Sequence, residues 1–351
     1  GFLFCVGAFG VQILAMGAIL QTATGISLIP AALIASIVTL AYTWSGGILA
    51  VTLTDAVQYV IIVIGVTLCA YLAIDHLGGF DAMMSILYSN PRFETNMKPL
   101  ANWSLVQFLG LFFSFLLGEF CAPYYIQRYA STKSAKDSKN GLLIFGVHWI
   151  FFMATSAAIG LASMAIQPDV KPDLAFTNLI RDILPPGITG LVFGALLAAV
   201  MSTGAAMINT SAVIYTRDIY NKFINTAATQ AQLLRQSRLS TLVVGGISIG
   251  VAIIFQDVFG LMIYMFKLWP SAILPPLMCG LLWGKISPYA GAPAVIAGGL
   301  SFFLWSDKVL GEPFGIPANF IGIGMNCLVL FFVHQKMKGH KPEGPFLPDL
   351  N

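Results

Sequence analysis

Two adjacent hydroxyl side chains lie within a strongly apolar stretch, at a spacing that suits the binding of a small cation. Ser202 and Thr203 follow Ala199 by three and four residues, so in a helix both hydroxyls and the Ala199 carbonyl share one face. Neutral oxygens without a carboxylate favour a weakly bound monovalent ion over Ca²⁺ or Mg²⁺. Ser and Thr in membrane helices also bond back to their own helix, so the spacing alone leaves both interpretations open.

Three ionisable residues stand in other apolar stretches: Asp55, Glu119 and Lys267. Placing Asp or Lys at the centre of a membrane helix costs about 2.5–3.5 kcal/mol, so such residues usually face a polar cavity or a partner. Snorkelling to the membrane surface is the structural alternative. For Lys267 two partners suggest themselves, a carboxylate on a solute or one of the two acidic residues, Glu119 and Asp55.

Helix-breaking residues occur near these charges. Gly118 and Pro123 flank Glu119, and Pro270, Pro275 and Pro276 follow Lys267. Proline leaves a backbone carbonyl without its usual N–H partner. In a membrane such carbonyls are tolerated beside other helices or a water-filled cavity, so both stretches are candidates for lining a translocation path.

The composition places these residues in a membrane protein. Of 351 residues, 57% are hydrophobic and 9% charged, whereas a soluble domain has about 25% charged residues. This excludes a soluble enzyme, and the net charge of +3 is too small to indicate nucleic-acid binding. Since about 20 apolar residues span a bilayer, we predict ten transmembrane helices, at residues 1–24, 27–43, 49–74, 104–125, 141–166, 187–215, 241–255, 259–283, 290–305 and 316–333.

The positive-inside rule orients these spans in a cell membrane. One set of connections holds only Arg92, Lys98, Lys171, Arg181 and Lys308. The other set, predicted to be cytoplasmic, includes loops 126–140 and 216–240 and the C-terminus, and its cations are Arg128, Lys133, Lys136, Lys139, Arg217, Lys222, Arg235, Arg238, Lys285, Lys336, Lys338 and Lys341. On the outside, Leu174, Leu179 and Leu184 give residues 167–186 a partly helical pattern. Two pairs of glycines four apart, Gly190 with Gly194 and Gly246 with Gly250, allow close helix contacts.

Three motifs, in this order and at this spacing, resemble the sodium:solute symporter family. They are Tyr42-Thr43-Trp44-Ser45-Gly46-Gly47 with Thr54-Asp55 and Gln58; Gly118-Glu119 with Pro123, Gln127-Arg128, Lys133 and Ala135-Lys136; and Leu197-Ala198-Ala199 with Met201-Ser202-Thr203, Asn209 and Asp218-Ile219-Tyr220.

The resemblance implies an all-α membrane protein with the inverted-repeat core of the leucine transporter. Residues 1–351 are then expected to form a single transporter domain. Within it, residues 1–76 are the last part of the first repeat, 104–284 the second repeat and 290–335 two peripheral helices. On this interpretation the chain is an N-terminally truncated member that lacks the first two core helices, which supply part of the ion and solute sites in the family.

The resemblance also implies roles for single residues. Ala199, Ser202 and Thr203 match the family's sodium ligands, and Asp55 matches an acidic residue on the sodium pathway. Residues that match the substrate-contacting helix are Phe115, Glu119 and Pro123, to which Lys267 is added as a candidate contact for a carboxylate. Because proline-transporting relatives carry an aromatic residue where this chain has Glu119, proline is not the expected substrate.

The function implied is sodium-coupled import of a small organic solute, with Na⁺ as the coupling ion and one ion per cycle. The alternative is a transporter-fold sensor that signals through an attached domain. An enzyme is not expected, because the sequence has no HExxH motif and its four histidines are scattered. No oligomeric state is predicted.

Overall fold

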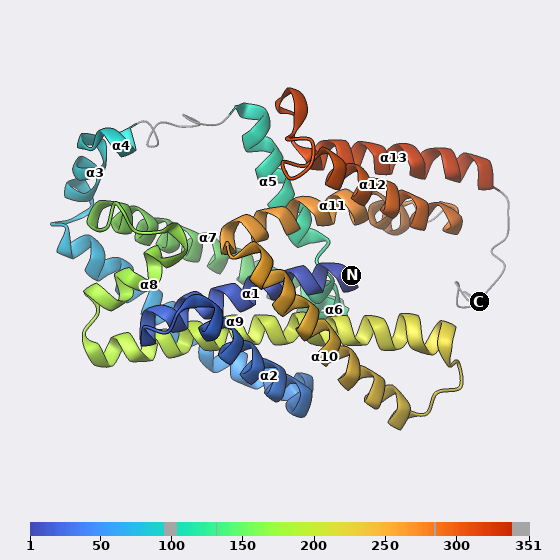
Figure 1. The fold of residues 1–351 in the computed structure, drawn as a ribbon, viewed down its shortest axis with the longest axis horizontal. Helices are drawn as coiled ribbons and strands as arrows, with labels where there is room; N and C mark the ends of the chain where they lie inside the picture. The colour runs from blue at the N-terminus through green and yellow to red at the C-terminus, as the bar shows by residue number, and fades with distance from the viewer. Residues whose placement is uncertain (95–103, 131, 284–285, 339–351) are drawn as a thin grey trace. The chain divides into compact units, whose positions relative to one another are not determined.

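A computed structural model describes residues 1–94, 104–130, 132–283 and 286–338. The side chains of residues 3, 45–56, 94 and 127–130 are not described. Every regular element in this part of the chain is a helix (Figure 1). The helices are α1 (Phe2–Thr24), α2 (Leu28–His76), α3 (Phe80–Ser89), α4 (Pro91–Glu94), α5 (Leu105–Phe120), α6 (Pro123–Ala130), α7 (Ala135–Ile166), α8 (Pro172–Ile183), α9 (Pro186–Val213), η1 (Ile214–Ile224), α10 (Gln230–Phe255), α11 (Val258–Leu282), η2 (Pro288–Ala290), α12 (Gly291–Trp305), η3 (Pro313–Gly315) and α13 (Ala318–Met337).

The chain divides into two compact units. The first comprises Gly1–Ala101 and Gln127–Leu261, and the second comprises Asn102–Ile126 and Met262–Asn351. This division does not follow the predicted repeats, since both ends of residues 104–284 fall in the second unit and the middle falls in the first. The single domain and its two repeats therefore stay a prediction, and the units are described separately.

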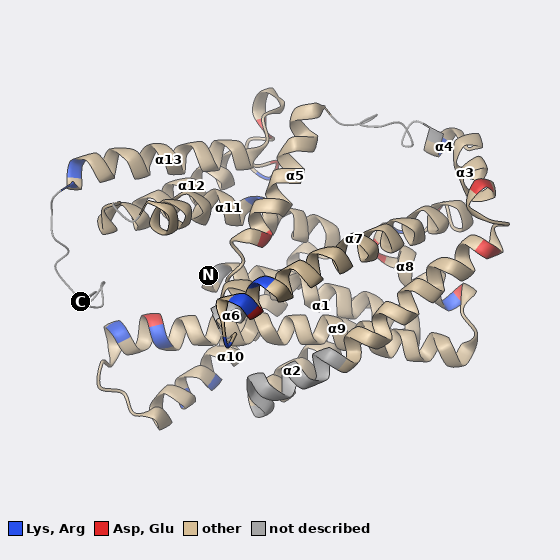
Figure 2. Ribbon diagram, turned by 180° about the vertical axis from the view of Figure 1, so that it is seen from behind, with Lys and Arg blue, Asp and Glu red and all other residues tan. Residues whose placement is uncertain are grey.

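Nine helices of the described chain are long and apolar enough to cross a membrane, one fewer than predicted. The missing one is the second predicted span, because the apolar helix Leu28–Trp44 is too short to qualify. It lies with the third predicted span inside α2, and their junction falls within 45–56. Figure 2 shows charged residues gathered towards helix ends, with none along the middle of α9.

The two predicted cytoplasmic loops are shorter than expected. The helix α7 begins at Ala135 rather than at residue 141, and its N-cap Ser134 accepts a hydrogen bond from the Asp137 amide. Similarly, η1 continues α9 to Ile224, and α10 starts at Gln230 with a Thr229 capping box. The first turns of both helices are polar, so a search for apolar spans placed their starts too late, although Gln, Lys and Arg are good helix formers.

A helix forms within residues 167–186, as the leucine pattern predicts. This helix is α8, in which Leu179 and Ile180 are fully buried. They join the apolar core of the first unit with residues of α2, α3, α7 and α9. Its Asp173 also accepts a hydrogen bond from the Val258 amide, so α8 caps the start of α11.

Close helix contacts in the first unit depend on glycines other than the predicted pairs. A Cβ atom at Gly204 would lie 2.8 Å from the Phe9 ring, and one at Gly245 would overlap the Leu40 side chain. The four paired glycines Gly190, Gly194, Gly246 and Gly250 have no atom within 4 Å of the corresponding position. These pairs therefore do not make the close contacts that their spacing allows, because glycine spacing does not show which face meets another helix.

The second unit has a polar centre that compensates for the prolines of α11. Pro275 and Pro276 have no N–H to donate to the carbonyls of Ser271 and Ala272, four residues earlier. The Asn326 Nδ2 atom on α13 donates to both carbonyls, at 3.0 and 2.6 Å. Asn326 is fully buried, so these carbonyls are satisfied by a neighbouring helix and do not line an open path.

We predict that Gly245→Ala destabilises the protein by about 1–3 kcal/mol, because the new methyl group displaces Leu40 from a packed contact. Gly246→Ala is the matched control, since its methyl group meets open space and alanine favours the helix. Thermal unfolding of the full-length protein in detergent measures both. Equal effects of the two substitutions would contradict the packing described here.

We also predict that Asn326→Leu, which keeps the branched shape of the side chain but has no donor, costs about 1–3 kcal/mol by leaving two buried carbonyls unpaired. Asn319→Leu is the comparison, because Asn319 Nδ2 donates to one carbonyl, that of Gly110, at 3.1 Å. The same unfolding assay should show the larger loss at position 326. The reverse order would show that the proline-freed carbonyls do not need this donor.

Candidate functional site

Three oxygens converge on one face of α9, in the first unit. The Ser202 and Thr203 hydroxyls both donate to the Ala199 carbonyl, at 2.9 and 3.0 Å. All three residues are half-buried. The structure thus shows the back-bonded arrangement that the sequence left open, with both hydroxyl oxygens next to the Ala199 carbonyl oxygen. Rotation of the two hydroxyls would turn their lone pairs towards a cation.

The backbone that carries these oxygens is held by two neighbouring helices. The Tyr42 hydroxyl on α2 donates to the Met201 carbonyl at 2.8 Å. The Phe9 ring on α1 lies against Gly204, where there is no side chain to keep α1 away. The oxygens therefore lie on a rigid element, with their positions set by packing.

The remaining sodium-pathway residue, Asp55, lies outside the residues whose side chains are described, so its role stays a prediction. Among the described residues no group of three or more His, Cys, Asp or Glu side chains could hold a metal ion. The α9 oxygens thus have no carboxylate cluster beside them in this part of the chain. A neutral oxygen set of this kind suits a monovalent cation.

The predicted solute contacts meet at a helix break in the second unit. The helix α5 ends at Phe120 and α6 starts at Pro123. Phe115 and Glu119 lie one turn apart on α5, just before this break. The Phe115 ring stacks on Phe266 of α11 with centroids 4.9 Å apart. The structure thus brings Phe115, Glu119 and Pro123 to one interrupted segment.

Two backbone carbonyls at this break accept hydrogen bonds from donors outside the usual helical pattern. Pro123 cannot donate to the Glu119 carbonyl, which instead accepts from the Ala122 amide at 3.1 Å. The Cys121 carbonyl accepts from the indole nitrogen of Trp269 on α11 at 3.0 Å. Trp269 is buried, so α11 fixes the backbone of the break.

Lys267 has a partner that the sequence did not suggest. Its ammonium group pairs with Glu312 at 3.1 Å, and the two side chains are only 22% and 21% exposed. Glu312 precedes η3 with a positive φ of 49°, and its carboxylate also accepts from the Ala318 amide at 3.1 Å. The pair therefore ties the α12–α13 connection to α11, and neither Glu119 nor a solute is needed to neutralise Lys267.

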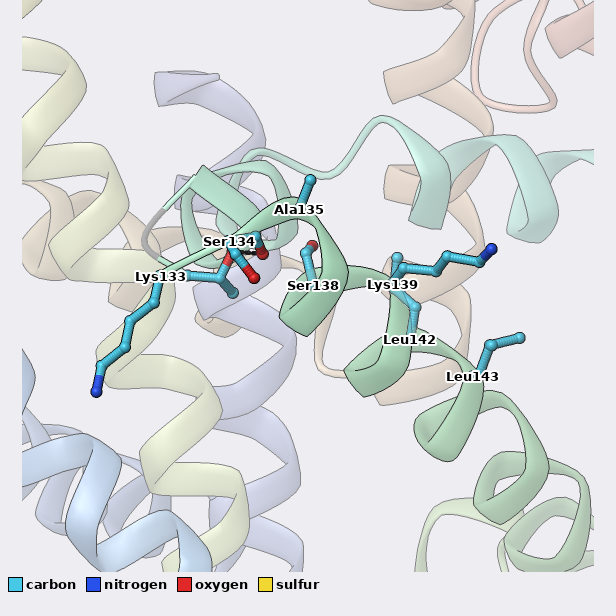
Figure 3. Close-up of a pocket in the computed structure, with 8 residues that line it drawn as sticks. Lys133, Ser134, Ala135, Ser138, Lys139, Leu142 and Leu143 are labelled. Carbon is cyan, nitrogen blue, oxygen red and sulfur yellow. Dashed lines mark hydrogen bonds between the residues drawn. The ribbon is translucent and has the colours of Figure 1, made fainter.

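A surface pocket of about 800 Å³ lies elsewhere, at the start of α7. It is lined by Thr132, Lys133, Ser134, Ala135, Ser138, Lys139, Leu142 and Leu143. Figure 3 shows Lys133 and Lys139 pointing to opposite sides of the segment, so the two charges do not converge on one ligand. None of the predicted site residues lines this pocket.

Sequence reasoning missed the residues that support the site. Trp269 and Glu312 were not assigned roles, since their partners Cys121 and Lys267 lie far away along the chain. The sequence does contain a signal for Glu312. It is an acidic residue flanked by Gly311 and Pro313, in the connection that also contains Lys308.

Comparison with known proteins shows where this chain belongs. The osmoregulated proline transporter OpuE of Bacillus subtilis (strain 168) is 28% identical over 283 residues, which are 78% of this chain and 56% of the relative. The sodium/proline symporter of Escherichia coli (strain K12) is 26% identical over 77% of this chain and 55% of its own length. The chain thus spans little more than half the length of these relatives.

A solved structure has the same fold. A Na⁺-coupled sialic acid symporter, captured substrate-bound in an outward-open state, matches 98% of this chain and 75% of its own with a TM-score of 0.70 at 20% identity. The model of the sodium:solute symporter family matches residues 1–298, which include both the α9 oxygens and the α5–α6 break. This chain belongs to the sodium:solute symporter family.

Proposed function

We propose that the full-length protein is a sodium-coupled symporter that carries a small organic solute across the cell membrane by alternating access. The observation that carries this proposal is the convergence of three neutral oxygens on α9. Family membership supports it, because every part of this oxygen set lies within the matched residues. Sodium is proposed as the coupling ion, bound by Ala199, Ser202 and Thr203, with Asp55 attracting it along the pathway.

The proposed cycle follows from differential affinity. Sodium bound at α9 favours the state that is open to the outside and completes the solute site, and the loaded protein then changes its accessibility. One positive charge that moves through 100 mV releases about 2.3 kcal/mol. This energy corresponds to about fifty-fold accumulation of solute before any sodium concentration gradient is added.

The proposed solute contacts are Phe115, Glu119 and Pro123 at the α5–α6 break. Discontinuous membrane helices are where transporters of this general kind place their substrates. A carboxylate on the solute was inferred from Lys267, and the Lys267–Glu312 pair weakens that inference. Because the relatives include transporters named for proline, L-proline is the first solute to test, even though Glu119 makes this chain differ from them.

We predict that sodium chloride stabilises the full-length protein relative to potassium chloride, and that Ser202→Ala/Thr203→Ala abolishes the difference. Saturation at about 100 times the dissociation constant contributes about 2.7 kcal/mol. Thr210→Ala is the matched control, since Thr210 makes the same back-bond, to Ala206 at 2.8 Å, further along α9. A folded wild type without a sodium response would contradict sodium coupling and favour the sensor alternative.

We predict that Lys267→Gln and Glu312→Gln each destabilise the protein by about 1–3 kcal/mol, because each leaves a largely buried charge without its partner. The double variant should recover part of that loss, as measured by a double-mutant cycle of thermal unfolding. If Lys267 instead binds a solute carboxylate, Lys267→Gln will lower solute affinity without loss of stability. Glu312→Gln will then not share its phenotype.

A further inference from the structure

Glu119 is an acidic side chain without a cationic partner in the described chain. It lies in the last turn of α5, within a segment apolar enough to cross a membrane. Its neighbours are phenols: the Tyr124 hydroxyl donates to it at 3.4 Å, and Tyr125 also hydrogen-bonds to it. No ion pair involves Glu119 among the residues described. A carboxylate in such a place normally has a positive partner.

Lys267, the basic residue of α11, already has an acidic partner. Lys267 follows directly after Phe266, whose ring stacks on Phe115, but its ammonium group is held by Glu312. The Glu312 carboxylate has a second tie to the Ala318 amide, which fixes it on the side of α11 that faces α13. The positive charge of Lys267 is thus already paired with Glu312.

The carboxylate of Glu119 is held on a fixed backbone. Trp269 donates to the Cys121 carbonyl two residues later, and the Phe266 ring lies against Gly118 one residue earlier. A Cβ atom at Gly118 would approach that ring to 2.6 Å, so α5 and α11 meet closely there. Glu119 is therefore positioned in advance, as a specificity-determining group must be.

The surroundings distinguish between the possible positive partners. A bare metal ion takes several oxygen ligands, and no group of three or more His, Cys, Asp or Glu side chains among the described residues could hold one. Glu119 has aromatic neighbours instead, Phe115 one turn before it and two tyrosines after it. A carboxylate beside aromatic rings suits an organic ammonium group, which gains both an ion pair and a cation–π contact. We propose that Glu119 binds the ammonium group of the solute and restricts the protein to amine-bearing substrates. This inference rests on the proposed symport function and narrows its substrate class.

Three related compounds separate the charges that Glu119 would recognise. L-Proline carries an ammonium and a carboxylate, L-prolinamide keeps only the ammonium, and cyclopentanecarboxylate keeps only the carboxylate. Binding to the full-length protein in sodium is measured by thermal shift and by competition. We expect both amines to stabilise the wild type. Cyclopentanecarboxylate should bind at least about tenfold more weakly, since it has no ammonium group to pair with Glu119 and its carboxylate is then repelled without compensation.

Glu119→Gln should remove this preference, so that the two amines lose at least about tenfold in affinity. Asp307→Asn is the matched control, because it removes an exposed carboxylate of the same unit and should leave all three affinities unchanged. Glu119→Asp keeps the charge on a shorter side chain and should retain the order of preference. The sodium response at α9 reports that each variant is folded.

Several results would overturn the assignment. One is that cyclopentanecarboxylate binds the wild type as well as L-proline does. Another is that Glu119→Gln still prefers the amines, which would leave Glu119 as a proton-binding or purely structural group. A wild type that responds to sodium but to neither amine would also overturn it, with sodium coupling intact. Loss of the sodium response itself would instead reject the proposed function.

Discussion

The hydrogen-bonding demand of backbone carbonyls is the constraint on which the second unit depends. A bilayer offers no water to a carbonyl whose helix partner is missing, and prolines remove such partners in α11 and at the start of α6. Asn326 replaces the partners removed by Pro275 and Pro276, and the Ala122 amide replaces the one removed by Pro123. Trp269 of α11 satisfies the neighbouring Cys121 carbonyl. Separating α11 from α13, or α5 from α11, would expose bare carbonyls, so each interrupted helix also determines which helix packs beside it.

In the first unit, the candidate site depends on packing around an uninterrupted helix. Its candidate cation site lies on α9, a helix without proline after Pro186, and the supporting contacts come from Tyr42 and from Phe9 against Gly204. The two units thus carry the two proposed ligands on different kinds of backbone. The ion oxygens lie on a continuous helix, whereas the solute contacts lie where a helix is interrupted and rebuilt by side chains.

Much of this arrangement follows from the sequence. Apolar length predicted nearly all the spanning helices, and three motifs predicted the family that the comparisons show. Helix starts at Ala135 and Gln230 were missed because polar first turns carry no apolar signal. The partners of Lys267, Cys121 and the proline-freed carbonyls could not be predicted either. Each is 45 to 148 residues from the group it serves, and local spacing says nothing about such pairs.

The back-bonded hydroxyls of α9 have a consequence for how readily an ion can depart. When Ser202 and Thr203 donate to the Ala199 carbonyl, the polar groups of the proposed sodium site satisfy one another without an ion. A sodium ion bound at the proposed site would compete with these two internal hydrogen bonds, which would weaken its binding and help its release on the side where sodium is scarce.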